Sequence, residues 1–239
     1  MANSSHLAYQ FDDSICPARE RIRTIIASRD EETDKAYDAW AHYYDEDMIT
    51  LGYGGYEAMG DNVIKFVADK NAKILDFGCG TGLFGQKLRS LGYMNTFGVD
   101  AADSFLEESR KKEVYLELEK HRFGIGLNAP YNDSSFDVVM SISVFGPNTI
   151  NHTALYEIDR ILSPGGYLMM FIRRSRLEME RENFNVKAVL EGWVTSGQWE
   201  RLSDGRGIYY SRPDGVGEGD EAVEQDGVII TMRKLQTST

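Results

Sequence analysis

The sequence predicts an α/β fold built on a parallel sheet, and three features of the chain support this prediction. Short apolar segments alternate with segments of helical periodicity from residue 73 onward. One apolar segment, 136–142, has the composition of a buried strand. A glycine-rich turn joins the first strand to the first helix of this alternation. At 239 residues, the chain is long enough to bury one substantial core.

Residues 1–69 are predicted to form an N-terminal tail and a helical lid, and residues 70–239 a single structural unit. The tail is polar and acidic and covers residues 1–17. Acidic residues and a glycine-rich break separate the helices that follow. These helices are expected over 18–28, 33–50 and 56–69.

The second of these helices carries an aromatic face. Tyr37, Trp40 and Tyr44 recur at the spacing of one side of a helix. Packing on the domain core explains such a face. Trp and Tyr also keep a polar group that a purely apolar position does not need. The alternative interpretation is therefore that Trp40 or Tyr44 closes over a bound ligand, and the sequence leaves both open.

The rest of the chain alternates strands and helices, as a parallel sheet requires. A third strand falls within 114–124 without clear limits, 163–166 is predicted as a turn, and 211–227 as a long acidic loop. Strands are expected over 73–77, 96–100, 136–142, 167–172, 199–202 and 228–233, and helices over 81–91, 104–112, 153–162 and 185–196.

The segment 74–83, Ile-Leu-Asp-Phe-Gly-Cys-Gly-Thr-Gly-Leu, predicts a ligand-binding loop. Its three glycines can adopt positive φ and carry no Cβ that would hold a ligand away from main-chain N–H groups. A helix expected to begin near Thr81 points its unpaired N–H groups at the loop. Asp76 stands at the strand end, where a carboxylate suits an amino-acid cation better than a phosphate.

The same loop argues against a dinucleotide cofactor. The last glycine of a G-x-G-x-x-G pattern would fall on Leu83, so the pattern fails. A nicotinamide-dependent oxidoreductase is therefore kept only as an alternative. An ordinary glycine-rich turn is the other alternative. The strand before the loop, the helix after it and the acid favour a ligand loop.

A second acid, Asp100, lies about 20 residues beyond the loop, at the end of the strand 96–100. In Rossmann-like sheets such an acid accepts hydrogen bonds from ribose hydroxyls, so Asp100 is the candidate ribose ligand. Its other role would be the N-cap of the helix 104–112. Asp103 stands nearer to that helix start and is expected to be the cap, which leaves Asp100 for a ligand.

Composition and charge exclude several classes of function. The formal net charge of −12 argues against non-specific nucleic-acid binding, and no nucleic-acid partner is expected. No apolar run is long enough to span a membrane, and the first residues lack the order of a signal peptide. Cys16 and Cys79, the only cysteines, are not expected to pair, which favours a reducing, cytoplasmic location. No Cys/His cluster has metal-ligand spacing, so no metal is expected.

Four motifs in this order and spacing resemble the class I S-adenosylmethionine-dependent methyltransferases. The stretches 37–45 and 197–200 resemble more narrowly the methyltransferase-like family named after the Williams–Beuren syndrome chromosome region. The resemblance covers residues 70–235. It implies a Rossmann-like, doubly wound sheet of seven strands with the last strand antiparallel, and S-adenosylmethionine as cofactor. The four motifs are Asp76-Phe77-Gly78-Cys79-Gly80-Thr81-Gly82, Gly98-Val99-Asp100, Ser135-Phe136-Asp137-Val138-Val139 and Leu162-Ser163-Pro164-Gly165-Gly166.

The resemblance also implies roles for residues of the cofactor site. Asp76 would orient the loop and the methionine amine, and Asp100 would hold the ribose. The other implied contacts are Gly78, Cys79 and Gly80 under the methionine part, Ala101 beside the adenine, and the Ser141 carbonyl on the methionine amine.

The adenine amine lacks its usual partner in this chain. A carboxylate commonly reaches that amine from the loop before the strand 136–142. Ile125 stands where the family has this acid. The substitutes are the backbone N–H groups of Gly126 and Leu127, or the amide of Asn128.

The predicted function is methyl transfer from S-adenosylmethionine to a small-molecule acceptor by in-line displacement. No residue is assigned a catalytic role, because an activated methyl donor needs mainly alignment of the acceptor and exclusion of water. His152 is a candidate general base, although a lone loop histidine is more often simply exposed. The alternative from another class is a cofactor-binding scaffold, with the acidic stretch 211–227 open to a protein partner.

Overall fold

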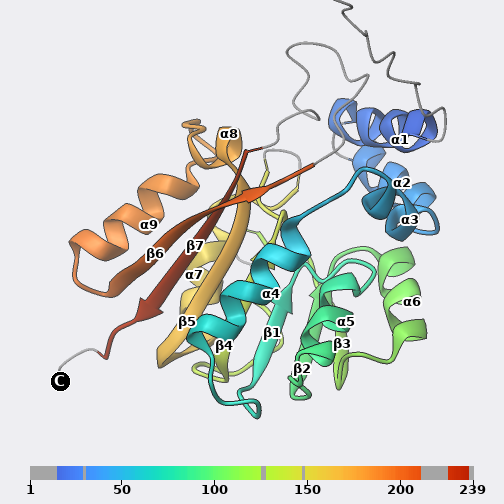
Figure 1. Ribbon diagram of the computed structural model, residues 1–239. Helices are drawn as coiled ribbons and strands as arrows, with labels where there is room; N and C mark the ends of the chain where they lie inside the picture. Colours follow the sequence, from blue (N-terminus) through green and yellow to red (C-terminus); the bar gives the residue numbers. More distant parts are fainter. Residues whose placement is uncertain (1–14, 29–30, 125–127, 147–148, 211–225, 237–239) are drawn as a thin grey trace, which may run out of the picture.

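The computed structural model describes residues 15–28, 31–124, 128–146, 149–210 and 226–236 (Figure 1). Several predictions fall on other residues. The tail up to residue 14, the loop residues Ile125, Gly126 and Leu127, and the acidic stretch over 211–225 lie outside the described part.

The core is one seven-stranded sheet with strand order β3-β2-β1-β4-β5-β7-β6. β1 pairs in parallel with both β2 and β4, and the last strand, β7, pairs antiparallel with β5 and with β6. This confirms the doubly wound sheet with an antiparallel last strand. The strands are β1 Ile74–Phe77, β2 Thr96–Asp100, β3 Glu117–Lys120, β4 Phe136–Ile142, β5 Leu162–Arg173, β6 Trp199–Ile208 and β7 Asp226–Lys234.

Helices cover both faces of the sheet, and neighbouring strand residues serve opposite faces. Ile74 belongs to the core beneath α4 and α5, whereas Leu75 belongs to the core beneath α7 and α9. Apolar strands buried on both sides are expected of a parallel sheet. The helices are α1 Ile15–Ala27, α2 Glu31–Trp40, α3 Tyr44–Thr50, α4 Gly55–Phe66, α5 Leu83–Ser90, α6 Asp103–Lys112, α7 Ala154–Ile161, α8 Arg174–Leu177 and α9 Val186–Thr195.

The N-terminal helices occupy two different places. α1, α2 and α3 lie beyond the carboxyl ends of the parallel strands, whereas α4 lies on a face of the sheet (Figure 1). Met59 and Val63 of α4 are fully buried in the sheet core. The division at residue 69 stays a prediction, and only α1 to α3 hold the position of a lid.

Several elements depart from their predicted limits. The helix expected over 33–50 is two helices, interrupted between Trp40 and Tyr44. The turn expected over 163–166 lies within β5. Phe136 and Val138 of β4 pair with Leu162 and Tyr167 of β5, so one residue of β4 lies opposite four residues of β5. This bulge accommodates the turn residues without ending the strand.

Candidate functional site

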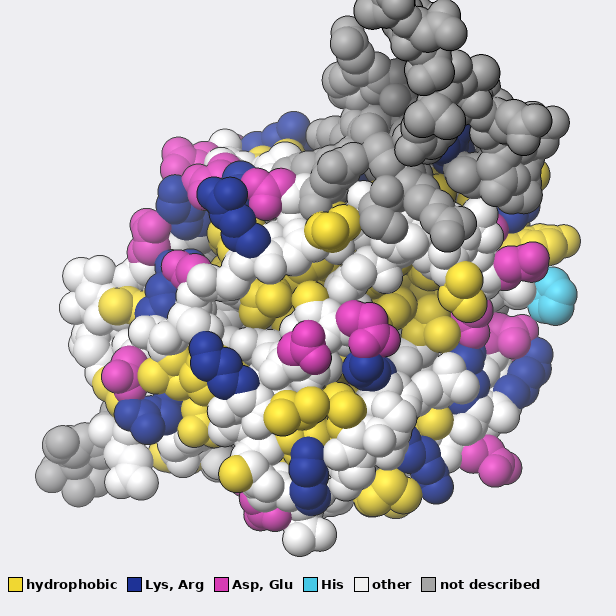
Figure 2. All heavy atoms as spheres, in the orientation of Figure 1, with side chains coloured by type: hydrophobic (Ala, Val, Ile, Leu, Met, Phe, Trp, Pro, Cys, Tyr) yellow, Lys and Arg dark blue, Asp and Glu magenta, His cyan; other side chains and the backbone are white. Residues whose placement is uncertain are grey.

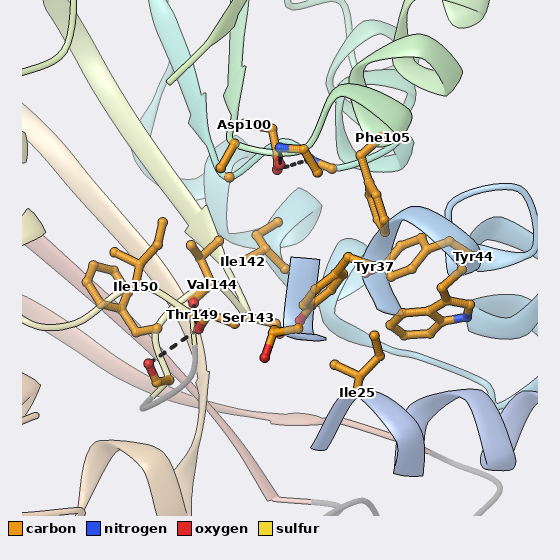
Figure 3. Close-up of a pocket in the computed structure, with 18 of the residues that line it drawn as sticks. Ile25, Tyr37, Tyr44, Asp100, Phe105, Ile142, Ser143, Val144, Thr149 and Ile150 are labelled. Atoms are coloured by element: carbon orange, nitrogen blue, oxygen red, sulfur yellow. Dashed lines mark hydrogen bonds between the residues drawn. The ribbon is translucent and has the colours of Figure 1, made fainter. Parts of the chain in front are cut away.

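A cavity of about 750 Å³ opens at the carboxyl ends of β1, β2, β4 and β5, with the N-terminal helices on its other side (Figure 3). In open α/β sheets, ligands bind at this end of the strands. The structure brings to the cavity six of the residues predicted from sequence, Trp40, Tyr44, Gly78, Gly80, Asp100 and Ala101.

The glycine loop has a backbone that only glycine adopts freely. Gly78 and Gly80 have φ values of +77° and +55°. A Cβ at Gly78 would lie 2.4 Å from a methyl carbon of Val144, so the loop packs directly against the segment after β4. Positive φ and close packing both require glycine at this position. α5 begins at Leu83, two residues later than predicted, after Gly82 in a left-handed conformation.

Asp100 holds the loop from the end of β2. One oxygen of its carboxylate accepts the N–H of Gly80 at 2.9 Å, and the other accepts the N–H of Ala102 at 3.0 Å. Burial raises the pKa of Asp100, and these backbone hydrogen bonds oppose that rise. The expectation that Asp103 caps α6 was wrong, because Ala102 is the N-cap and Asp103 pairs with Lys120. Each Asp100 oxygen keeps acceptor capacity for a ribose hydroxyl.

Asp76 lies beneath the loop rather than in the cavity wall. Its side chain is buried and accepts the hydroxyl of Tyr115 at 2.5 Å. Burial raises the pKa of Asp76 to about 7, and the hydrogen bond from Tyr115 opposes the rise. Cys79 is also buried below the loop, with its backbone N–H donated to Val99. Both residues therefore support the loop from below, and a direct contact of either side chain with a ligand has no support in this arrangement.

The carbonyl that faces the loop at the end of β4 belongs to Ile142. The N–H of Ser143 donates to the carbonyl of Phe171 on β5 at 2.7 Å. In a trans peptide the preceding carbonyl points the opposite way, so the Ile142 carbonyl points toward β1 and the Ser141 carbonyl toward β5. Ile142 lines the cavity, and Ser141 is not among its described lining residues. The Ile142 carbonyl, and not the Ser141 carbonyl, is therefore the one on the side of the glycine loop.

Two further candidates stand away from the cavity. Asn128 is exposed and absent from the described lining, and Gly126 and Leu127 lie outside the described residues. His152 accepts the backbone N–H of Asn185, the N-cap of α9, through Nδ1 at 3.2 Å. This bond gives His152 a structural role and does not bring it to the cavity.

The aromatic face of the N-terminal helices forms one wall of the cavity. Tyr37 and Tyr44 each pack edge-on against Phe105 of α6, at ring-centroid distances of 5.6 and 5.1 Å. The indole N–H of Trp40 donates to Asp47 at 2.7 Å. The polar group of Trp40 is thus satisfied inside the lid, while the residue lines the cavity. The packing interpretation therefore holds, and closure of Trp40 or Tyr44 over a bound ligand stays a prediction.

A polar contact joins the lid to the glycine loop. Asp45 of α3 accepts the hydroxyl of Thr81 at 2.5 Å and pairs with Lys112 of α6 at 2.7 Å. The same Lys112 donates to the Thr81 carbonyl at 2.6 Å. The lid therefore contacts the loop on which a ligand would lie.

Sequence reasoning missed one wall of the cavity. Tyr209 and Tyr210 line it from the end of β6, where the predicted strand had already stopped at residue 202. Residues 203–207, Ser-Asp-Gly-Arg-Gly, carry no strand pattern, so only the apolar and aromatic residues that follow, Ile208, Tyr209 and Tyr210, could have indicated that the strand continues. The backbone of Tyr53 bridges to Tyr210, and its hydroxyl shares a hydrogen bond with Ser143. This wall is the far end of the same cavity.

The cavity fits S-adenosylmethionine. Asp100 has a carboxylate suited to ribose hydroxyls, and Ile142 has a carbonyl suited to an amine. The half-buried backbone of Gly78 and Gly80 would allow the methionine chain to approach closely. Gly78 and Gly80 both line the cavity at positive φ, and neither places a Cβ between the main chain and a ligand. A family model described as a methyltransferase domain matches residues 75–170, which hold these groups. Residues 75–170 therefore match a methyltransferase domain, and the fold and the cavity support a class I S-adenosylmethionine-dependent methyltransferase.

Known proteins similar to this chain carry the same class of activity in their names. Methyltransferase-like protein 27 of Homo sapiens is 28% identical over 199 residues, 82% of this chain and 80% of that protein. Probable tRNA methyltransferase 9B of Bos taurus is 30% identical over 134 residues, 55% of this chain but 27% of that protein. A solved SAM-dependent methyltransferase of Thermotoga maritima, titled a possible histamine N-methyltransferase, shares the fold with a TM-score of 0.58 at 21% identity and covers 83% of this chain and 97% of its own. The predicted class and cofactor are confirmed.

The net charge led to the expectation that this protein has no nucleic-acid partner, and these relatives correct that expectation. A protein with this type of domain is named for tRNA, so the sum of charges was not sufficient ground for the exclusion. Net charge counts the whole surface, whereas recognition uses one part of it. On the face shown in Figure 2, basic and acidic side chains are interspersed. Across the described ranges, no helix is long and apolar enough to cross a membrane.

Proposed function

We propose that this enzyme binds S-adenosylmethionine along the glycine loop and transfers its methyl group to an acceptor that enters beside Tyr53 and Ser143. The observation that carries this proposal is one continuous cavity that joins Asp100 and the loop to these two residues. Asp100 would hold the ribose, the Ile142 carbonyl the methionine amine, and the rings of Tyr44 and Trp40 would cover the bound cofactor.

The chemistry requires alignment more than acid–base catalysis. S-adenosylmethionine supplies an electrophilic methyl group: the acceptor bonds to the methyl carbon as the S–CH₃ bond breaks and its electron pair passes to sulfur. The N-terminal helices would exclude water from the cavity. Tyr53 and Ser143 share a hydrogen bond at the expected acceptor position and would orient the acceptor by hydrogen bonding.

The first candidate acceptor is a small molecule, because the proposed acceptor end of the cavity is walled by Tyr53, Tyr209 and Tyr210. The second candidate is a tRNA nucleotide. The name of the bovine relative favours it, although the chain spans only 27% of that protein. An extruded nucleotide could use the same cavity.

Calorimetric titration with S-adenosylhomocysteine tests the cofactor site. We expect binding by the native protein and roughly tenfold or greater loss in Asp100→Ala. Unchanged affinity in that variant would overturn the assigned site. Transfer of a labelled methyl group is then followed with a small-molecule extract and, separately, with bulk tRNA. Labelling of one fraction selects the acceptor class, and binding without transfer to either fraction favours the scaffold alternative.

A further inference from the structure

The charged residues that line the cavity differ between its two ends. The acidic ones in the described lining are Asp38, Asp100 and Asp103, which come from α2, β2 and the start of α6. Asp38 accepts the hydroxyl of Ser104 at 2.6 Å, so it is engaged with α6. The carboxyl end of β5 and α8 contribute basic residues to the other end, Arg173 and Arg176. The cofactor end also holds the basic residues Lys120, which pairs with Asp103, and Arg122. Within the described lining, the far end holds basic residues and no acid, and it is called the basic end.

Aromatic rings hold Arg173 in a fixed orientation. Its guanidinium carbon lies 4.4 Å from the ring centroid of Tyr209 and 5.7 Å from that of Tyr210. Tyr53 packs against the same two rings at 5.1 and 5.8 Å. A planar guanidinium stacked in this way loses little freedom when it binds a carboxylate or phosphate through two parallel hydrogen bonds.

A short series of contacts connects this arginine to the glycine loop. The Gly78 backbone packs on Val144, and the adjacent Ser143 donates its N–H to Phe171. The Phe171 ring stacks on Tyr209 at 5.6 Å with an interplanar angle of 12°. Arg173 covers that same Tyr209. The basic end therefore adjoins the position proposed for the acceptor.

The same contacts disfavour a cationic acceptor. An ammonium group is commonly recognised on the faces of Tyr rings. Here Arg173 already lies over Tyr209 and Tyr210, and its charge would repel a second cation. Burial raises the pKa of Tyr53 and Tyr210, so their hydroxyls stay protonated and can donate hydrogen bonds to an anion.

We infer that the methyl acceptor carries an anionic group, a carboxylate or a phosphate, that binds Arg173 with Arg176 beside it. This inference rests on the proposed function, because it takes the acceptor to enter beside Tyr53 and Ser143. Arg173 anchors the acceptor and is a specificity-determining residue. The methylated atom is another part of the acceptor, held nearer to Ser143.

The test uses matched probes that differ in charge. The 239-residue chain, saturated with S-adenosylhomocysteine, is titrated by ligand-observed NMR with three pairs of probes: benzoate and benzamide, phenylacetate and phenylacetamide, and uridine 5′-monophosphate and uridine. We expect the anionic member of at least one pair to bind roughly tenfold or more tightly than its neutral partner. Preference for a carboxylate points to an organic acid, and preference for the monophosphate points to a nucleotide.

Three variants assign the effect to Arg173. Arg173→Gln should abolish the preference for the anion, and Arg173→Lys should retain only part of it, because lysine cannot form the planar pair of hydrogen bonds. Arg174→Gln is the matched control, since Arg174 is the adjacent arginine, pairs with Asp226 and is not in the described cavity lining. It should keep the full preference.

Affinity for S-adenosylhomocysteine, measured by calorimetry, should be the same in the native protein and in all three variants. This second measurement also shows that each variant is folded. Should Arg173→Gln fail to fold, Arg176→Gln takes its place and should weaken the preference. Equal binding of each anion and its neutral partner, no binding of any anion, or a preference that survives Arg173→Gln would overturn the inference. If the native protein did not bind S-adenosylhomocysteine, the proposed function would be refuted instead.

Discussion

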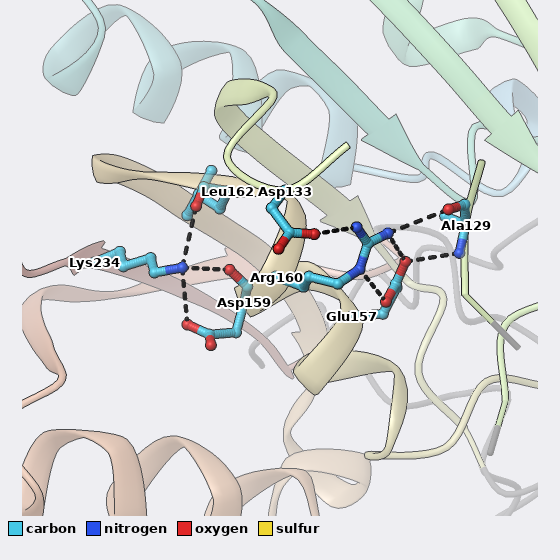
Figure 4. Close-up of polar contacts among 7 residues, drawn as sticks. All are labelled: Ala129, Asp133, Glu157, Asp159, Arg160, Leu162 and Lys234. Atoms are coloured by element: carbon cyan, nitrogen blue, oxygen red, sulfur yellow. Dashed lines mark hydrogen bonds and ion pairs between the residues drawn. The ribbon is translucent and has the colours of Figure 1, made fainter. Parts of the chain in front are cut away.

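Two polar clusters of this enzyme use the same chemistry for different purposes. Behind the sheet, Arg160 of α7 pairs with Glu157 and Asp133 and donates to the Ala129 carbonyl, joining α7 to the segment before β4 (Figure 4). In the N-terminal helices, Asp47 accepts two hydrogen bonds from Arg21, both at 2.6 Å.

The two clusters differ in what they hold. The Arg160 cluster joins elements of the sheet layer to each other, and its residues are absent from the described cavity lining. Asp47 joins α1 to α3 and also accepts the indole N–H of Trp40, which is a wall of the cavity. One cluster therefore stabilises the frame, and the other sets the position of the lid. This difference predicts that damage to the first lowers global stability, whereas damage to the second lowers ligand affinity.

The largest effect should come from a glycine that belongs to the cavity. Gly78→Ala adds a Cβ 2.4 Å from a Val144 methyl carbon at a φ of +77°. We expect a loss of about 2–5 kcal/mol in stability, from strain at positive φ together with overpacking, and a large loss of S-adenosylhomocysteine affinity. Thermal unfolding and calorimetry measure the two effects.

Gly165→Ala is the matched control for this substitution. Gly165 also has positive φ, +85°, but a Cβ there would meet nothing within 4 Å. Only the conformational cost remains, about 1–2 kcal/mol, and cofactor affinity should not change. Equal loss of S-adenosylhomocysteine affinity in both variants would show that this affinity depends on global stability rather than on local packing at the loop.

The next largest effect separates the two clusters directly. Asp47→Asn removes the charge that Arg21 pairs with and weakens the acceptor of Trp40. Hydrogen bonds to charged groups are worth about 1.5–3 kcal/mol, and we expect this loss to fall on the lid. Hydrogen exchange should rise in α1 to α3, and affinity for S-adenosylhomocysteine should fall.

Glu157→Gln is the corresponding change in the frame. Glu157 accepts from Arg160 and from the Ala129 N–H. We expect a similar loss, about 1.5–3 kcal/mol, but in global unfolding and with unchanged cofactor affinity. If both variants opened the lid, or both lowered global stability alone, the distinction between frame and lid would be wrong.

The sequence predicted the frame better than the lid for a physical reason. Strand and helix periodicity, the glycine loop and Asp100 are local patterns, and each was located within a few residues. The contact of Thr81 with Asp45 spans 36 residues, and Tyr209 reaches the cavity only because β6 runs longer than its pattern. Such contacts depend on packing between distant segments, which periodicity does not encode.

The same limit applies to the candidate site residues. Asp100 was found because its place at a strand end is itself the signal. Ser141 was named where the carbonyl of its neighbour Ile142 faces the loop, because a shift of one residue along a strand reverses the direction of the carbonyl. A pattern that locates a strand end within one residue is therefore insufficient to name the contact.

A smaller effect tests whether the hydrogen bond between Tyr115 and Asp76, beneath the glycine loop, stabilises the fold. The pKa of Asp76, about 7 in the folded protein, lies above the usual 3.8, so its contribution to stability is present at low pH and is lost as pH rises toward 7. Tyr115→Phe removes a hydrogen bond that favours the charged carboxylate. The pKa of Asp76 should rise further, and the variant should lose about 1–2 kcal/mol more at pH 8 than at pH 5. Equal losses at both pH values, measured by denaturant unfolding, would contradict this assignment.

The smallest effect concerns the contact between lid and loop. Asp45→Asn weakens its pair with Lys112 and its bond from Thr81, and the Asp45 side chain is 34% exposed. A partly exposed pair contributes about 0.2–1 kcal/mol, so stability should change little. If this contact holds the lid over the bound cofactor, release of S-adenosylhomocysteine in stopped-flow experiments should be roughly two- to fivefold faster. Asp133→Asn, the exposed pair of the frame, should leave that rate unchanged. Faster release in both variants would mean that the frame, and not the lid contact, controls how long the product stays bound.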